Sequence, residues 1–191
     1  MTTVGYLKLV QLLKSGKVAV MPTDTIYGIV GSALFPETVE NIYRLRKRAT
    51  DKPFIILIHS LNDLNHFNIT LTEKKVKFLE KIWPNPVSIV LPCGDAKLKY
   101  LHRGKNSLAF RMPKDEKLME ILKSTGPLVA PSANFEGEKP SETIDEAKKY
   151  FRDKVAFYLD RGRINSQPST LIKLNNNGSY EILREGDFKL P

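Results

Sequence analysis

The segment that most restricts the fold of this chain is the uninterrupted apolar run FIILI at residues 54–58. It has the length of a strand, and a strand without polar side chains is stable only when other elements cover both of its faces. Segments with helical spacing stand before and after this run, and short apolar runs recur along the rest of the sequence. This alternation predicts an α/β fold in which helices flank a buried sheet.

Helices are expected where apolar residues recur at intervals of three or four. Val4, Leu7, Val10 and Leu13 have this spacing, and Gly16 follows them as a stop signal. The same criteria place further helices at residues 36–46, 72–82, 114–123 and 143–151.

Strands are expected at the short apolar runs: residues 17–21, 54–58, 87–91, 108–112, 128–130, 155–159, 170–174 and 180–183. Because the last strands follow one another without intervening helices, the sheet should contain antiparallel as well as parallel pairs. The chain has 191 residues, of which 41% are hydrophobic, and this supplies one ordinary core. We therefore expect a single domain over residues 1–191, with an open, twisted, mixed sheet and flanking helices.

The positive charge of the chain is concentrated in two windows. The whole sequence has 30 Lys and Arg against 21 Asp and Glu, a formal charge of +9. Residues 44–52 contain five basic residues and one acid, and residues 97–114 contain six basic residues and no acid. Their net charges of +4 and +6 account for all of the excess. The windows are either solvated surface or two walls of one anion site.

Neither a membrane span nor a signal peptide is expected from the sequence. The longest apolar run has only five residues, and Lys8, Lys14 and Lys17 interrupt the N-terminal stretch. Cys93 is the only cysteine, so an intramolecular disulfide cannot form. A reducing compartment fits this composition, and we expect a cytoplasmic location.

Several motifs of enzyme chemistry are missing from the sequence. It contains no G-x-x-x-x-G-K-[ST], no G-x-G-x-x-G and no G-x-S-x-G. His59, His66 and His102 do not have the spacing of metal ligands, and one cysteine cannot complete a zinc site. We therefore expect no metal site built from the protein.

Small hydroxyl, amide and arginine residues instead gather near the expected strand ends. They occupy residues 22–28, 46–53, 107–111, 131–134 and 168–170. Each segment alone is typical of turns and caps. As a set, they can supply neutral donors for a small zwitterion and fixed cations for phosphate groups.

These segments also carry a resemblance to a known family. PTDTIYG at residues 22–28, RKR at 46–48 with KP at 52–53, PSAN at 131–134 and ST at 169–170 stand in the order of the YrdC/TsaC family, the threonylcarbamoyl-AMP synthases. The resemblance implies an open, twisted, mixed sheet with a basic concave cavity. It further implies a nucleotidyltransferase that converts L-threonine, bicarbonate and ATP to threonylcarbamoyladenylate and pyrophosphate, the first step toward N6-threonylcarbamoyladenosine in tRNA.

The resemblance assigns expected roles to individual residues. The threonine site would consist of Thr25, Arg111, Ser132 and Ser169. The ATP site would consist of Arg48, Lys52, Ser107, Asn134 and Arg184, with Ser141 or Thr143 as a further contact. The catalytic cations would be Arg46, Lys47 and Arg48, where either Arg46 or Lys47 takes the place of the lysine in the family's K-x-R pair.

The implied chemistry needs no nucleophile from the protein. A carbamate formed on the threonine amine attacks the α-phosphate of ATP, so the protein must align two anions and neutralise the charge that develops. Mg²⁺ is expected to arrive with ATP. The adenylate would pass to a tRNA threonylcarbamoyl transferase complex, and RNA contact by this chain is a secondary expectation.

The main alternative is a non-catalytic RNA-binding module whose basic concave surface follows a phosphate backbone. This interpretation leaves Arg111 and the PSAN and ST segments without a role. A carbamoyl-transfer relative is expected to have a larger, multidomain chain. A purely structural protein would leave the clustered charge unexplained.

Overall fold

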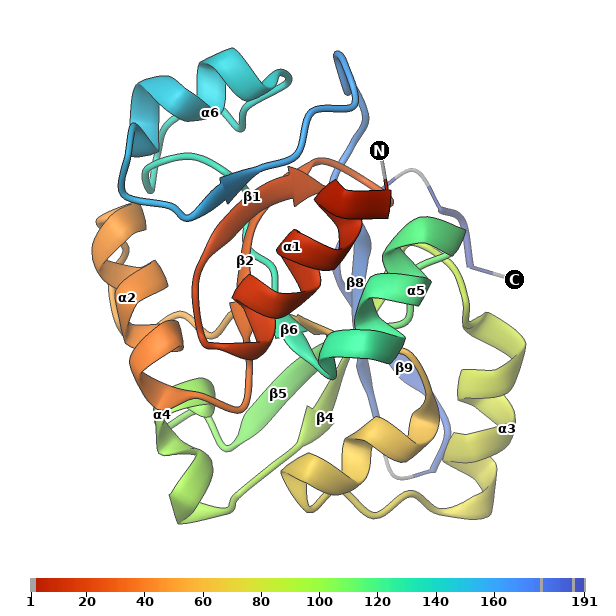
Figure 1. Cartoon of the computed structure of the whole chain (residues 1–191). Helices are drawn as coiled ribbons and strands as arrows, with labels where there is room; N and C mark the ends of the chain where they lie inside the picture. The colour runs from red at the N-terminus through yellow and green to blue at the C-terminus, as the bar shows by residue number, and fades with distance from the viewer. Residues whose placement is uncertain (1–2, 176, 187, 191) are drawn as a thin grey trace.

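A mixed sheet runs through the computed structural model, which describes residues 3–175, 177–186 and 188–190 (Figure 1). Its nine strands lie in the order β7-β1-β2-β6-β3-β5-β4-β8-β9. The strands are β1 Ala19–Pro22, β2 Tyr27–Ser32, β3 Ile55–Leu57, β4 Val87–Pro92, β5 Ser107–Arg111, β6 Leu128–Val129, β7 Phe157–Tyr158, β8 Thr170–Leu174 and β9 Tyr180–Arg184. β3 pairs with β5 in parallel and with β6 antiparallel. The prediction of a mixed sheet is confirmed.

Helices flank the sheet on both faces (Figure 1). The α-helices are α1 Thr3–Lys14, α2 Pro36–Arg46, α3 Glu73–Ile82, α4 Lys99–His102, α5 Glu116–Thr125 and α6 Ile144–Phe151. Two 3₁₀ helices, η1 Leu61–Phe67 and η2 Ala96–Leu98, connect β3 to α3 and β4 to α4. The five helices expected from periodicity are all present. Among the described residues, no helix is long and apolar enough to cross a membrane.

Side-chain caps explain where three of these helices begin. The Thr72 hydroxyl accepts a hydrogen bond from the Lys75 amide before α3, and the Asp115 carboxylate accepts one from the Leu118 amide before α5. Thr143 does the same for α6. Each cap satisfies an amide of the first turn that has no partner within the helix.

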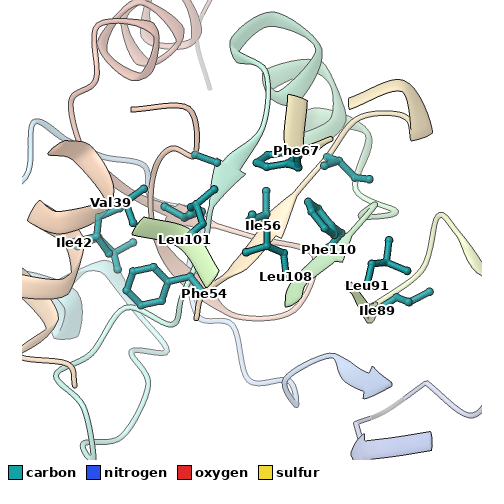
Figure 2. Close-up of a cluster of buried hydrophobic side chains, with 14 of the residues drawn as sticks. Val39, Ile42, Phe54, Ile56, Phe67, Ile89, Leu91, Leu101, Leu108 and Phe110 are labelled. Atoms are coloured by element: carbon teal, nitrogen blue, oxygen red, sulfur yellow. The ribbon is translucent and has the colours of Figure 1, made fainter. Parts of the chain in front are cut away.

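Strand residues alternate between two apolar cores, one on each face of the sheet. α1 and α5 lie side by side over one face, where the Tyr6 hydroxyl lies 3.0 Å from the Ser124 hydroxyl (Figure 1). Leu57 of β3 belongs to this smaller core, whereas Ile56 belongs to the larger core on the opposite face (Figure 2). Both side chains are fully buried. The prediction that the 54–58 run is covered on both sides is therefore confirmed.

β2 is a strand that the periodicity did not predict. All six of its residues are buried, but Gly28 and Gly31 interrupt its apolar pattern. A Cβ at Gly31 would stand 2.5 Å from Cγ2 of Thr38 on α2, so the helix packs directly against the strand backbone. Glycine is required at this close approach, and it hides the strand from a pattern-based prediction.

β5 connects the larger core with the opposite face of the sheet. Leu108 and Phe110 point into the larger core, and Phe110 lies against the Phe67 ring with centroids 5.1 Å apart (Figure 2). Because side chains alternate along a strand, Ala109 and Arg111 point the other way. Both of these residues line a cavity.

Candidate functional site

A cavity of about 260 Å³ lies over the middle of the sheet, where the ends of several strands and loops meet. Its walls come from the β1–β2 loop, the end of α2, strands β3 and β5, and the segment after β6. The start of β8 and the end of β9 complete them. Among the residues assigned to the site from the sequence, those that line the cavity are Thr25, Arg46, Arg48, Arg111, Ser132, Ser169 and Arg184. Residues up to 159 positions apart in the chain, Thr25 and Arg184, thus share one cavity.

The β1–β2 loop presents two hydroxyl groups to the cavity. The Thr23 hydroxyl accepts hydrogen bonds from the amides of Thr25 and Ile26, both at 3.3 Å, and donates to the Ile26 carbonyl at 2.7 Å. The Thr25 hydroxyl lies 3.1 Å from the Thr23 hydroxyl. This local network fixes the loop and with it the direction of the Thr25 side chain.

Arg111 forms a buried ion pair at the end of β5. Its Nη2 lies 2.9 Å from Oδ1 of Asp24, and the two side chains are 4% and 5% exposed. Burial raises the pKa of Asp24 and lowers the pKa of Arg111, and the opposite charge of the partner counteracts both effects. Arg111 Nε is buried without a hydrogen-bond partner. The guanidinium therefore keeps donor capacity beyond its contact with Asp24.

Arg46, rather than Lys47, enters the cavity. Arg46 Nε donates to the Asn134 carbonyl, and Nη2 donates to the Ser132 hydroxyl and to Asn134 Oδ1, each at 3.1 Å. Lys47 is exposed, with its Nζ 4.2 Å from the centre of the Phe135 ring. Burial, together with the charge of Arg48, lowers the pKa of Arg46 to about 10. A buried guanidinium held only by neutral acceptors is well suited to an anionic ligand.

Arg48 lines the cavity, as Arg46 does, whereas Lys52 lies at the rim of the cavity and contacts the carboxylate of Glu136. Arg48 Nε donates to the Lys52 carbonyl at 3.3 Å, and its guanidinium lies 5.5 Å from the centre of the Phe54 ring. Lys52 Nζ lies 2.8 Å from Glu136 Oε1, and Glu136 Oε2 accepts from the Ala49 amide at 2.7 Å. These contacts hold the pKa of Glu136 at about 2.

Ser169 and Arg184 complete the opposite wall. The Ser169 hydroxyl lies 2.8 Å from the Ser88 hydroxyl of β4. Its carbonyl accepts hydrogen bonds from Nε and Nη2 of Arg184, at 3.2 and 2.8 Å. Burial and the charge of Arg111 lower the pKa of Arg184.

Besides Lys52 at the rim, four other residues assigned to the ATP site from the sequence lie outside the cavity walls. Asn134 Nδ2 donates to the carbonyls of Phe135 and Glu138, both at 2.7 Å, so its amide organises the following loop. The Ser141 hydroxyl donates to the Ala133 carbonyl at 2.5 Å. Thr143 caps α6, and Ser107 starts β5. In this structure, therefore, Asn134 and Ser141 shape the cavity through the segments they support.

Only some of the basic residues in the two charged windows line the cavity. Of the eleven basic residues in the two windows, Arg46, Arg48 and Arg111 line it, and Arg184 of β9 adds a fourth guanidinium. Arg103 lies elsewhere, paired with Glu40 at 2.7 Å. The charge windows alone therefore do not define the site.

The described residues contain no group of three or more His, Cys, Asp or Glu side chains arranged to hold a metal ion. None of the described residues that line the cavity is an acid, and Asp24, which lies between Thr23 and Thr25 in the chain, is paired with Arg111. These residues do not fit a resident Mg²⁺ cage, which takes oxygen ligands in octahedral geometry.

Three residues that organise the site were not predicted from the sequence: Thr23, Asp24 and Glu136. Thr23 and Asp24 belong to the PTDTIYG segment, next to Thr25, and this position beside an assigned residue could have indicated them. Nothing in the sequence pairs Glu136 with Lys52, because 84 residues separate them.

Known proteins are similar to this chain over nearly its whole length, including the segments that form the cavity. The family model for the Sua5/YciO/YrdC domain, described as telomere recombination, matches residues 11–186. A threonylcarbamoyl-AMP synthase of Pyrococcus abyssi is 30% identical over 181 residues, covering 93% of this chain and 53% of the relative. The threonylcarbamoyl-AMP synthase of Vibrio campbellii is 24% identical over 184 residues, covering 94% of this chain and 97% of the relative.

A solved structure has the same fold. P. abyssi Sua5 complexed with L-threonine superimposes with a TM-score of 0.85 and 27% identity, over 95% of this chain and 54% of that chain. The protein thus spans about half the length of the P. abyssi relative. Since the family model covers most of the sequence and the fold agrees with a solved member, the chain belongs to the Sua5/YciO/YrdC family.

Proposed function

We propose that this protein is a threonylcarbamoyl-AMP synthase, a nucleotidyltransferase that acts on L-threonine, bicarbonate and ATP. The observation that carries the proposal is the cavity, which combines four guanidinium groups with the hydroxyls of Thr25, Ser132 and Ser169. Two relatives carry this activity in their names, and the similar P. abyssi Sua5 structure is a complex with L-threonine.

The residues can be divided between the two proposed substrates. Arg111 binds the threonine carboxylate, and Thr25 and the serines of the wall bind its hydroxyl and amine. Arg46, Arg48 and Arg184 face the phosphates of ATP, and Mg²⁺ enters as the counter-ion of ATP. The cavity volume of about 260 Å³ is slightly below the usual range of about 300–1,000 Å³ for ligand pockets. It suits the amino acid and the reacting phosphate better than the whole nucleotide.

The proposed reaction has two bond-forming steps. Bicarbonate first loses hydroxide to give carbon dioxide. The threonine amine then adds to the carbon atom of carbon dioxide and releases a proton, and the product is a carbamate. A carbamate oxygen then attacks the α-phosphorus of ATP, and the bond between that phosphorus and the bridging oxygen of pyrophosphate breaks. Negative charge grows on the phosphoryl oxygens, and fixed guanidinium groups stabilise it without reorganisation.

The decisive experiment measures pyrophosphate release by the purified protein with ATP, Mg²⁺, bicarbonate and labelled threonine. We expect release that requires both threonine and bicarbonate, and a labelled adenylate as the second product. Release that continues without threonine would contradict the proposal. RNA affinity with a steep salt dependence and no ATP turnover would favour the alternative, an RNA-binding module.

A matched pair of variants tests the placement of ATP. Arg48 lines the cavity, whereas Arg44 is an exposed arginine of α2 that lies four residues earlier. We expect Arg48→Ala to lower pyrophosphate release by about 10²-fold or more, because mutation of a transition-state donor costs that much in other enzymes. Arg44→Ala should retain the activity of the unaltered protein. Equal activity of the two variants would remove Arg48 from the proposed site.

A further inference from the structure

The four arginines of the cavity differ in what balances their charge. Among the described residues, Arg111 is the one cavity arginine with a carboxylate within ion-pair distance, Asp24 at 2.9 Å. Arg46 and Arg184 donate to carbonyl, hydroxyl and amide oxygens, and Arg48 donates to a backbone carbonyl. Asp24 thus balances the charge of Arg111, whereas Arg46, Arg48 and Arg184 leave about three positive charges with no carboxylate within ion-pair distance.

Asp24 is held in place by its own loop. Thr23 and Thr25 on either side of it line the cavity, and the Thr23 hydroxyl fixes the turn through three hydrogen bonds. The carboxylate itself is buried, and Oδ2 has no hydrogen-bond partner. A buried charge interacts more strongly with its surroundings than a charge in water, because the effective dielectric constant is lower.

The two proposed substrates also differ in charge, as the surroundings of the cavity arginines do. Threonine is a zwitterion with one carboxylate, whereas the triphosphate of ATP and the pyrophosphate product carry several negative charges. A cavity lined by four unbalanced guanidinium groups would bind polyphosphate throughout and exclude the amino acid. A fixed anion behind one arginine makes polyphosphate binding at that end unfavourable, and it leaves N–H donors for a single carboxylate.

We propose that Asp24 is a specificity-determining residue, which acts through Arg111 to reserve one end of the cavity for the zwitterionic amino acid and to exclude polyphosphate from it. This inference rests on the proposed function, because that function supplies the two ligands that must be separated. Asp24 touches neither ligand, and its effect is the repulsion of excess negative charge.

The test uses isothermal titration calorimetry with inorganic pyrophosphate. We compare the unaltered protein with Asp24→Asn, which keeps the shape and removes the charge, and with Asp24→Glu, which keeps the charge. Glu40→Gln is the matched control, because Glu40 also forms an ion pair with an arginine, Arg103, but outside the cavity. Circular dichroism shows whether each variant is folded.

Asp24→Asn should bind pyrophosphate at least about tenfold more tightly, equivalent to about 1.4 kcal/mol, and pyrophosphate should then displace bound threonine. Asp24→Glu and Glu40→Gln should keep the affinity of the unaltered protein. A gain in affinity is informative because structural damage would weaken binding. Unchanged or weaker pyrophosphate binding by folded Asp24→Asn would overturn the inference.

A measurement on the unaltered protein covers the case in which Asp24→Asn does not fold. Pyrophosphate at saturation should leave threonine bound, and displacement of threonine by pyrophosphate would also overturn the inference. The proposed function fails separately, if the unaltered protein releases no pyrophosphate in the presence of threonine and bicarbonate. In that event the pyrophosphate affinities of the four proteins still decide the role of Asp24.

Discussion

Gly186, which follows β9, packs against the backbone of residues 168–170 in the cavity wall so closely that no side chain fits there. A Cβ at this position would stand 2.3 Å from the Pro168 carbonyl oxygen, 2.6 Å from the Thr170 amide nitrogen and 2.8 Å from the Ser169 carbonyl carbon. All three atoms belong to the backbone, so rotation of a side chain cannot relieve the overlap. Gly186→Ala must therefore separate the segment after β9 from the segment that carries Ser169.

The cost of this separation can be estimated. Added methyl groups in packed regions cost about 1–3 kcal/mol, and a clash with backbone belongs at the upper end, at about 3 kcal/mol. In a chain of this length, 1 kcal/mol lowers Tm by about 2–4 °C, so Gly186→Ala should melt about 6–12 °C lower. Displacement of Ser169 should also weaken the bonds from Arg184 to its carbonyl, at 3.2 and 2.8 Å.

Thermal unfolding followed by circular dichroism measures the first effect, and the KM values for threonine and ATP measure the second. Gly94→Ala is the control, because a Cβ there would meet no heavy atom within 4 Å. A surface substitution of this kind should change stability by less than about 0.5 kcal/mol. If Gly186→Ala melted at the same temperature as Gly94→Ala, the close packing of the two segments would be refuted.

Three further predictions concern the core, the cavity rim and ligand binding. Phe110→Ala removes a fully buried ring and should cost about 3–5 kcal/mol in urea unfolding, with an unchanged m-value. The pKa of Glu136 is held at about 2, below its ordinary 4.5, so its stabilising contact with Lys52 is present above pH 4.5 and is lost as the pH falls toward 2. Glu136→Gln should therefore be less stable than the unaltered protein at pH 6 and equally stable near pH 2, as unfolding at a series of pH values would show. Pyrophosphate at 100 times its Kd should stabilise the protein by about 2.7 kcal/mol and raise Tm by about 5–11 °C, and Arg48→Ala should shift less in the same melting assay.

Much of the fold could be predicted because its helices and most of its strands have regular apolar patterns. The position of Arg46 also follows from periodicity, since it stands four residues after buried Ile42 on the same face of α2. β2 could not be predicted, because its glycines serve a close contact with α2 that only the folded chain reveals. The apolar pattern of a segment predicts its own secondary structure. Such a prediction fails where packing against a distant element determines the residue type.

The site residues could be named from the ordered segments of the sequence, but their contacts could not. Arg111 and Asp24 are far apart in the chain, as are Arg46 and Asn134, which are separated by 88 residues. Sequence order alone cannot indicate that Lys52 faces Glu136 at the rim or that Lys47 turns to Phe135. The roles of these residues in binding threonine and ATP stay predictions.

The arrangement of acceptors around the arginines matters more for anion binding than the net charge of the chain. A guanidinium held by neutral oxygens is fixed in direction, yet its charge remains available to a ligand. Arg46 and Arg184 are held in this way, by Asn134 and Ser132 and by Ser169. Exposed basic residues of the same windows are screened by water and salt, so each contributes little to the binding of a small anion. Neutralising either Arg46 or Arg184 should therefore strongly weaken the binding of a small anion, although the net charge of the chain falls only from +9 to +8.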